Sequence, residues 1–314
     1  MSKVPVDGLQ NLQGEHDYDI VWPWTRPGGL RNGSTAVLRV KNEARSLPWV
    51  LPGLLRVCDK VLIVDNQSDD GTGEVAKRTA VDMGLGDHLD VVEYPFRVAR
   101  AGAEHLAEPE LSVHSLSYFY NWSFAQVDTA FSWKWDGDMV LTAEGELAMA
   151  EFGWRSFRKD VILKFPRHGL YVESDRRAYL DLSLHNAEGW GFPIGPDWTY
   201  TKSFEWEVRR RPENTVDAIL PRGLCVELKY LDGDEFGHWT DPESFATSAR
   251  NARKRYEWSV FNALTNGEVP EELITIDAPE GTHVIDYVTK TWLPTAPRPL
   301  KPPVRAVGRT HDEP

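Results

Sequence analysis

Two aspartates separated by one glycine, Asp136-Gly137-Asp138, form the pattern in this sequence best suited to chemistry. They directly follow residues 131–135, a short apolar stretch that is typical of a strand. Carboxylates at this spacing offer hard oxygen ligands to a divalent cation, which can also hold a diphosphate. The same three residues make an ordinary turn, as a second copy at Asp232-Gly233-Asp234 illustrates, so the surrounding elements decide what the motif means.

The sequence ahead of the motif predicts a β-α-β-α-β unit. Residues 60–65 are continuously apolar up to a final aspartate, which is typical of a strand buried on both faces of a parallel sheet. Alternation of strands and helices predicts a doubly wound α/β fold, in which a mostly parallel open sheet is flanked by helices and the ligand site lies at the carboxyl ends of the strands. Strands are expected at 35–40, 60–65, 89–93, 131–135, 161–165, 178–182 and 225–231, and helices at about 46–58, 72–83, 112–127 and 242–264.

Two segments of this unit carry a further resemblance. Residues 40–44 (VKNEA) and 64–72 (VDNQSDDGT) resemble the N-terminal half of family 2 glycosyltransferases, which have a GT-A fold. Together with Asn121, fifteen residues ahead of Asp136, the resemblance covers about residues 35–141. The residues that match the two segments directly are Asn42, Glu43, Asp65, Asn66, Ser68, Asp70 and Thr72.

The resemblance implies a donor site for a nucleotide sugar. Asp136 and Asp138 would hold Mn²⁺ or Mg²⁺ against the diphosphate, and carboxylates such as Asp65 and Glu43 can accept hydrogen bonds from a base or a ribose. Ser68, Asp70 and Thr72 could equally do no more than shape the turn and cap the next helix. The residues expected to bind the donor nucleotide are Asn42, Glu43, Asp65, Asn66, Asn121 and Asp136.

Beyond residue 141 the candidates rest on chemistry alone. His238 could complete the coordination of the cation, or be a structural histidine beside Trp239. Arg250 and Lys254, on one predicted helix, could neutralise the leaving diphosphate, although such charges usually form a solvated face.

Transfer with inversion needs a general base at the acceptor hydroxyl. Glu205 and Glu207 alternate along an extended segment and therefore point to opposite faces, and Asp197 is a third candidate. Asp232 and Asp234 compete for the role. The family usually places its base in an acidic pair after the metal motif, and no such Glu-Asp pair occurs here.

A Gly-, Pro- and Trp-rich segment, residues 186–200, is expected to be a loop that closes over the donor, with aromatic surface for a sugar. Trp133 and Trp135 share one face of a strand and are expected in the core. Cys58 and Cys225 are expected to be buried thiols outside any disulfide framework.

The chain of 314 residues is expected to form one elaborated domain. Residues 1–34 form an N-terminal extension, 35–141 the donor half and 142–240 the acceptor half of that domain. A C-terminal helical segment covers 241–292, and the Pro-rich tail 293–314 is expected to be extended or disordered.

Charge and hydropathy limit the kinds of partner that the protein is expected to bind. A net charge of -13 argues against nucleic acid. Because no run of about 18 apolar residues and no signal-peptide pattern is seen, a cytoplasmic protein without membrane insertion is expected.

The function expected from these features is a metal-dependent hexosyl- or pentosyltransferase. Its donor would be a UDP-sugar, or else a GDP-sugar, and its acceptor would be an unidentified glycan, protein or small molecule. Two alternatives remain. One is a non-catalytic sugar-binding or scaffolding protein, and the other is a sugar-phosphate nucleotidyltransferase, for which the Gly-rich loop after the first strand is missing.

Overall fold

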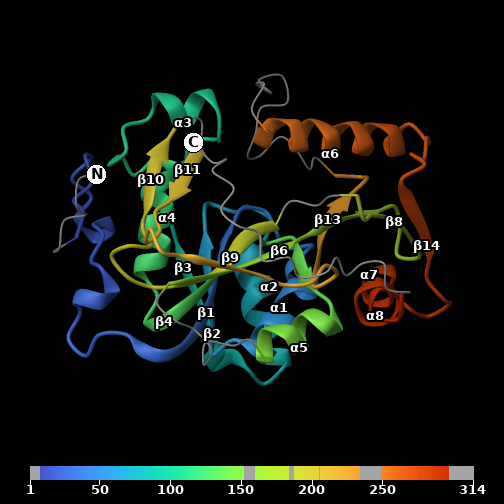
Figure 1. Ribbon diagram of the computed structural model, residues 1–314, viewed down its shortest axis with the longest axis horizontal. Helices are drawn as coiled ribbons and strands as arrows, with labels where there is room; N and C mark the ends of the chain where they lie inside the picture. The colour runs from blue at the N-terminus through green and yellow to red at the C-terminus, as the bar shows by residue number, and fades with distance from the viewer. Residues whose placement is uncertain (1–7, 152–159, 184–186, 205, 234–248, 297–314) are drawn as a thin grey trace.

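The computed structural model describes residues 8–151, 160–183, 187–204, 206–233 and 249–296 (Figure 1). Its centre is a seven-stranded sheet in which every strand runs parallel to its neighbours except β9, which is antiparallel to both of its own. In spatial order the strands are β12 (Val216–Ile219), β6 (Val161–Pro166), β9 (Ala187–Pro193), β4 (Thr129–Trp135), β1 (Arg31–Val40), β2 (Lys60–Asp65) and β3 (Leu89–Glu93).

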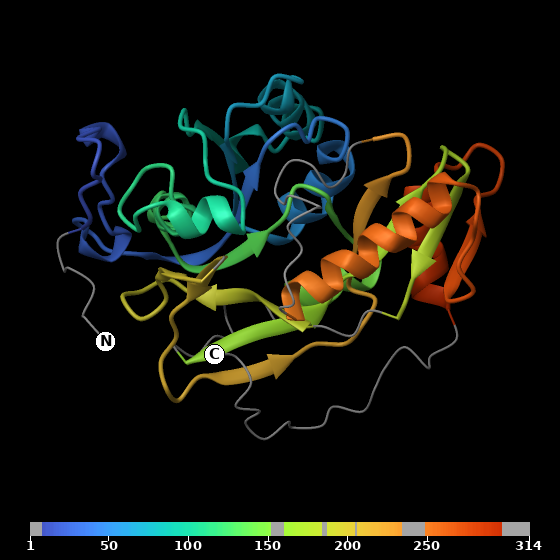
Figure 2. The same ribbon diagram turned by 90° about the horizontal axis from the view of Figure 1, so that it is seen from above.

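A second sheet of five strands lies next to the first, and a separate two-stranded hairpin packs beside helix α4 (Figures 1 and 2). The hairpin consists of β10 (Tyr200–Ser203) and β11 (Trp206–Arg209). The five-stranded sheet has the order β14 (Leu273–Asp277), β8 (Arg177–Asp181), β7 (His168–Val172), β13 (Cys225–Tyr230) and β5 (Met139–Leu141).

Helices cover both faces of the central sheet. The α-helices are α1 (Leu47–Val57), α2 (Thr72–Asp82), α3 (Ala103–Ala107), α4 (Leu116–Ala125), α5 (Ala143–Glu151), α6 (Ala249–Thr265), α7 (Val284–Tyr287) and α8 (Leu293–Thr295). A π-helical turn, Val288–Trp292, joins α7 to α8, and short 3-10 turns occur at His16–Tyr18, Pro23–Thr25 and Gly86–His88. None of the helices in the described ranges is long and apolar enough to cross a membrane.

The two faces of the sheet have separate cores because side chains alternate along each strand. On β1, Leu38 and Val40 pack with α1 and α2, whereas Val37 packs with α4. Burial on both sides explains why the strands read as continuous apolar runs in the sequence. Helix α6 packs on the second sheet through Val260 and Leu264.

The predicted α/β class, a mostly parallel open sheet flanked by helices with a C-terminal helical segment, is confirmed. Trp133 and Trp135 lie in the core as expected, and both cysteines are buried free thiols. The predicted tail lies largely outside the described residues.

The expected loop at residues 186–200 is wrong, because it contains the central strand β9. Trp190 and Phe192 are fully buried rather than available to a sugar. A Cβ atom on Gly191 would lie 2.6 Å from the ring of Trp133, so the glycine is required by packing against that ring.

Candidate active site

The polar residues of the two family-like segments meet at one edge of the sheet. Strands β2 and β4 lie on either side of β1 and run parallel to it, so their carboxyl ends share an edge. Asp65 ends β2, Glu43 follows β1, and Asp136 directly follows β4. Ligands bind at this edge in open α/β sheets.

The segments after β1 and β2 are joined by hydrogen bonds from backbone to side chain. The backbone N–H of Asn42 donates to Ser68 Oγ at 2.9 Å, and that of Glu43 donates to Thr72 Oγ1 at 2.8 Å. Asp70 Oδ2 accepts from the N–H of Ala44 at 2.9 Å. Ser68, Asp70 and Thr72 therefore fix the position of Glu43 at the edge.

Asn42 also contributes to this loop structure. Its φ of 59° lies in the left-handed region, which asparagine tolerates better than most residues. Its Oδ1 accepts from the N–H of Asp69 at 3.0 Å. Asp65 Oδ1 accepts from the N–H of Ser68 at 2.9 Å.

Two asparagines expected at the nucleotide are buried and bonded to backbone. Asn66 donates to the carbonyls of Tyr94 and Phe96 at 3.0 and 2.7 Å. Asn121 donates to the carbonyl of Tyr200 at 2.8 Å and accepts from its N–H at 2.7 Å. These groups hold loops and the β10–β11 hairpin in place.

The Asp136-Gly137-Asp138 turn packs closely against the β1 loop. A Cβ atom at Gly137 would lie 2.7 Å from Cγ of Glu43 and 3.0 Å from Cγ1 of Val40. Only glycine allows this approach. On the other side, the carbonyl of Asp138 accepts from the N–H of Leu228 at 2.9 Å, which ties the turn to β13.

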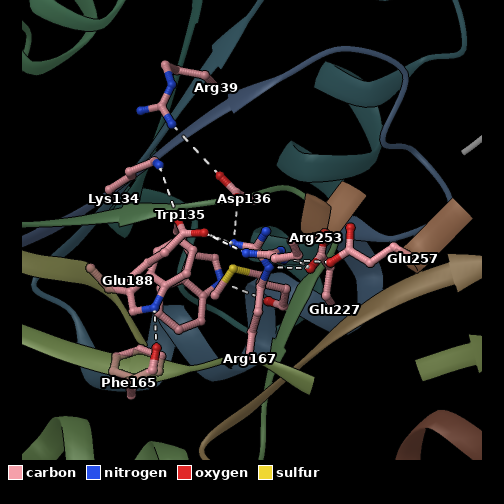
Figure 3. Close-up of polar contacts among 12 residues, drawn as sticks. Arg39, Lys134, Trp135, Asp136, Phe165, Arg167, Glu188, Glu227, Arg253 and Glu257 are labelled. Carbon is pink, nitrogen blue, oxygen red and sulfur yellow. Dashed lines mark hydrogen bonds and ion pairs between the residues drawn. The ribbon is translucent and has the colours of Figure 1, made fainter. Parts of the chain in front are cut away.

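Positive side chains surround Asp136 (Figure 3). Arg39 Nη2 lies 3.9 Å and Arg167 Nη1 lies 3.8 Å from its carboxylate oxygens. Burial acts to raise the pKa of Asp136, but the neighbouring cations outweigh it and hold this pKa below its usual range. In order of effect these cations are Lys134, Arg167, Arg39 and Lys254.

Asp138 has the opposite electrostatic environment. Burial, and then the nearby Glu227 carboxylate, raise the pKa of Asp138 to about 8. Its side chain forms no hydrogen bond or ion pair with a described residue. The Asp138 side chain is half-buried, and the negative charges of Glu227 and Asp136 disfavour its ionised form.

No third protein ligand is found among the described residues. Within the described ranges, no three His, Cys, Asp or Glu side chains converge as a metal-binding group. His238 lies outside the described residues, as do Glu205, Asp234 and the side chain of Arg250.

A buried network of charges connects this site to α6 (Figure 3). Arg167 pairs with Glu227, and with Glu188 at 3.2 Å. Arg253 of α6 pairs with Glu188 at 2.7 Å and with Glu257 at 2.7 Å. Lys254 joins the network through Glu257, at 3.4 Å. The structure thus brings the predicted Lys254 close enough to act on Asp136.

The residues expected to act as the general base differ in their exposure to solvent. Asp197 is exposed in the turn before β10, and exposed Asp232 pairs with Arg45 at 2.6 Å. Glu207 is 8% exposed, and its charge acts on Arg39, Tyr120 and Lys134. Of the described candidates, Glu207 is the one whose charge acts on Arg39 and Lys134, the cations beside Asp136.

Sequence reasoning missed Arg39, Lys134 and Arg167. The first two interrupt strands that are otherwise apolar or small, and a charged residue is almost never fully buried without a partner. A charged residue inside a strand of this kind was the signal in the sequence from which Arg39 and Lys134 could have been identified.

No family model and no curated protein matches the chain. Solved structures that resemble it include residues 1–349 of S. aureus TarS in complex with UDP, at 16% identity and a TM-score of 0.31, over 43% of this chain and 36% of that chain. Another is glucosyl-3-phosphoglycerate synthase from Mycobacterium tuberculosis in complex with Mn²⁺, UDP and phosphoglyceric acid, at 15% identity and a TM-score of 0.30, over 48% of this chain and 51% of that one. The matched region is about half or less of each of these chains. Overlaps of this extent assign neither a family nor an activity.

Proposed function

We propose that this chain is a metal-dependent glycosyltransferase of the GT-A type, which transfers a sugar with inversion from a UDP-sugar, or else a GDP-sugar, to an acceptor hydroxyl. The observation that carries the proposal is the position of Asp136-Gly137-Asp138, at the sheet edge shared with Asp65 and Glu43. Residues expected to bind a cation and a nucleoside therefore lie side by side.

The residues present suit a divalent cation. Asp136 and Asp138 would hold Mn²⁺ or Mg²⁺, with His238 as the proposed third ligand. When bound, the cation would offset the negative charge that grows on the leaving diphosphate.

The side chains of the protein would bind the nucleoside and neutralise the diphosphate. Glu43 and Asp65 would accept hydrogen bonds from the base or ribose of the donor. Lys254 and Arg167 would neutralise diphosphate charge, which is supported by the effect of their positive charges on Asp136.

The acceptor side would be served by Glu207. Its buried carboxylate lies on the same side of the sheet as Arg39 and Lys134. Glu207 would take the proton of the acceptor hydroxyl as the new bond to the sugar forms.

A nucleotide-release assay tests the proposal. The protein is incubated with UDP-sugars and GDP-sugars and a panel of glycan, protein and small-molecule acceptors, in Mn²⁺ or in EDTA, and free UDP or GDP is measured. We expect release from one nucleotide class in Mn²⁺ only, and its loss in Asp138→Asn. Asp232→Asn, in the exposed second copy of the motif, is the matched control and should keep full activity.

Two further measurements, nucleotide binding by calorimetry and pyrophosphate release, separate the alternatives. Metal-dependent nucleotide binding without release would favour a sugar-binding or scaffolding protein. Pyrophosphate formed from a nucleoside triphosphate and a sugar phosphate would identify a nucleotidyltransferase.

A further inference from the structure

Glu188 of β9 presents a carboxylate at the sheet edge that carries the candidate donor site. Strand β9 is antiparallel to β4, with Gly191 opposite Trp133, so the beginning of β9 lies beside the end of β4 that leads to Asp136. The side chain of Glu188 is 32% exposed, and that of Asp136 is 34% exposed. A ligand at this edge can therefore contact both carboxylates.

One nitrogen atom links the two carboxylates (Figure 3). Arg167 Nη1 lies 3.8 Å from Asp136 Oδ2 and 3.2 Å from Glu188 Oε1. Arg253 Nη1 donates to the same Glu188 oxygen at 2.7 Å, and Lys134 Nζ lies 3.9 Å from Glu188 Oε2. The side chains of these three cations are at most 15% exposed. The carboxylates are thus more exposed than the cations that pair with them.

The order of the strands places Glu188 relative to the proposed donor. Along this edge the strands follow one another as β2, β1, β4 and β9, at a spacing of about 4.8 Å. Asp65 and Glu43 lie at the ends of the first two, Asp136 at the end of the third, and Glu188 at the end of the fourth. In a nucleotide sugar the diphosphate joins the nucleoside to the sugar. A donor with its nucleoside at Asp65 and its diphosphate at Asp136 therefore extends its sugar towards Glu188.

The chemistry of a carboxylate limits which sugar can lie there. An ionised carboxylate only accepts hydrogen bonds and has about four acceptor positions, so a ligand hydroxyl can be added to the contacts with the arginines. The hydroxyls of a neutral sugar can donate such a bond. A uronate would instead bring its own negative charge to the exposed carboxylates of Glu188 and Asp136, which would repel it.

We propose that Glu188 binds the sugar of the donor and selects a neutral sugar over an acidic one. Glu188 accepts a hydrogen bond from a hydroxyl of that sugar, while Arg167 and Arg253 hold its carboxylate in place. This inference rests on the proposed function and names the class of sugar that the same site takes.

Calorimetry with nucleotides and nucleotide sugars tests the role of Glu188 without turnover. The neutral probes are UDP-glucose, UDP-galactose, UDP-N-acetylglucosamine and GDP-mannose. Each is compared with its uronate, in which C6 carries a carboxylate, and UDP and GDP alone are the references. All titrations are made in Mn²⁺. We expect the wild type to bind at least one neutral probe, and to bind the matching uronate more weakly.

Substitutions assign the sugar contact to Glu188. Because both arginines donate to Oε1, Glu188→Gln would present an NH₂ donor in place of the second carboxylate oxygen. The affinity for the neutral probe, relative to that for its free nucleotide, should fall at least tenfold. Glu257→Gln is the matched control, because Glu257 accepts from the same Arg253 side chain at 2.7 Å but has no exposed side-chain surface, and it should leave this ratio unchanged. Should Glu188→Gln fail to fold, as judged by circular dichroism, Glu188→Asp must show the loss, because its carboxylate is drawn back from the sugar.

Three results would overturn this role of Glu188. They are an unchanged ratio in Glu188→Gln, an equal fall of the ratio in Glu257→Gln, and tighter binding of a uronate than of its neutral counterpart by the wild type. If the wild type binds neither UDP nor GDP, the proposed function fails, and the role of Glu188 fails with it. If the wild type binds one of these nucleotides and Glu188→Gln leaves the ratio unchanged, only the role of Glu188 is lost.

Discussion

Arg253 of α6 donates a hydrogen bond to Glu188 of β9 at 2.7 Å, so a C-terminal helix is fastened to a central strand of the main sheet. The same side chain also reaches Glu227, at 3.3 Å. Since Arg167 lies between these acids and Asp136, the helix and the candidate metal site share one charge network (Figure 3).

Removing Arg253 should therefore loosen both the fold and the site. Arg253→Met would leave Glu188, Glu227 and Glu257 without one of their cations, and we expect a loss of about 3 kcal/mol in the free energy of unfolding. Urea denaturation measures it. Arg255→Met, exposed on the same helix, should cost less than about 1 kcal/mol. Equal effects of the two substitutions would contradict a structural role for the network.

Gly137→Ala should weaken donor binding. The added methyl group would meet Glu43 and Val40 within 3.0 Å, so the turn or the β1 loop must move, at a cost of about 1–3 kcal/mol. We expect the affinity for UDP with Mn²⁺ to fall at least tenfold in calorimetry. Gly195→Ala is the control, since its Cβ would meet only Trp198, at 3.9 Å. Unchanged UDP affinity in Gly137→Ala would count against the placement of the donor at this turn.

Asn121→Ala separates a structural role from a nucleotide contact. The substitution leaves the N–H and carbonyl of Tyr200 unpaired in a buried region, which should lower stability by about 1–3 kcal/mol. The affinity for UDP, measured on the folded variant, should stay within about twofold of wild type. A large loss of affinity with little loss of stability would restore the nucleotide contact that the family resemblance implies.

Glu207→Gln tests the proposed base. Glutamine keeps the size of the side chain but cannot accept the proton, so the rate of transfer to an acceptor should fall by about 10²–10⁴-fold. Binding of UDP with Mn²⁺ should be unaffected. Asp197→Asn, at an exposed position, should retain the wild-type rate. A normal transfer rate in Glu207→Gln would exclude Glu207 as the base.

The first half of the fold could be predicted because its signals are local. Strands β2 and β3 have the expected bounds, since apolar runs there end at clear turn residues. Strand β9 was missed because glycine, proline and tryptophan near the centre of a sheet look like a loop in sequence. Gly191 fits there only because Trp133, far away along the chain, occupies the space beside it.

The positions of some candidate site residues in the fold were predictable as well. Parallel strands place Asp65 and Asp136 at one edge, which follows from the order of elements alone. Arg39 and Lys134 lie among apolar residues, and their burial depends on α4 and on a hairpin some seventy residues or more further along the chain. Because side chains alternate along a strand, Glu205 and Glu207 are expected on opposite faces. The sequence does not show which of these faces is on the side of Arg39, because that depends on tertiary packing.

Calorimetric titration of UDP and of GDP in Mn²⁺ and in EDTA, on wild type and on Asp136→Asn, tests the central claim most directly. We predict binding by the wild type in Mn²⁺ only, and affinity reduced at least tenfold in the variant. Metal-independent binding, or equal affinity in both proteins, would contradict a donor site built on Asp136 and Asp138.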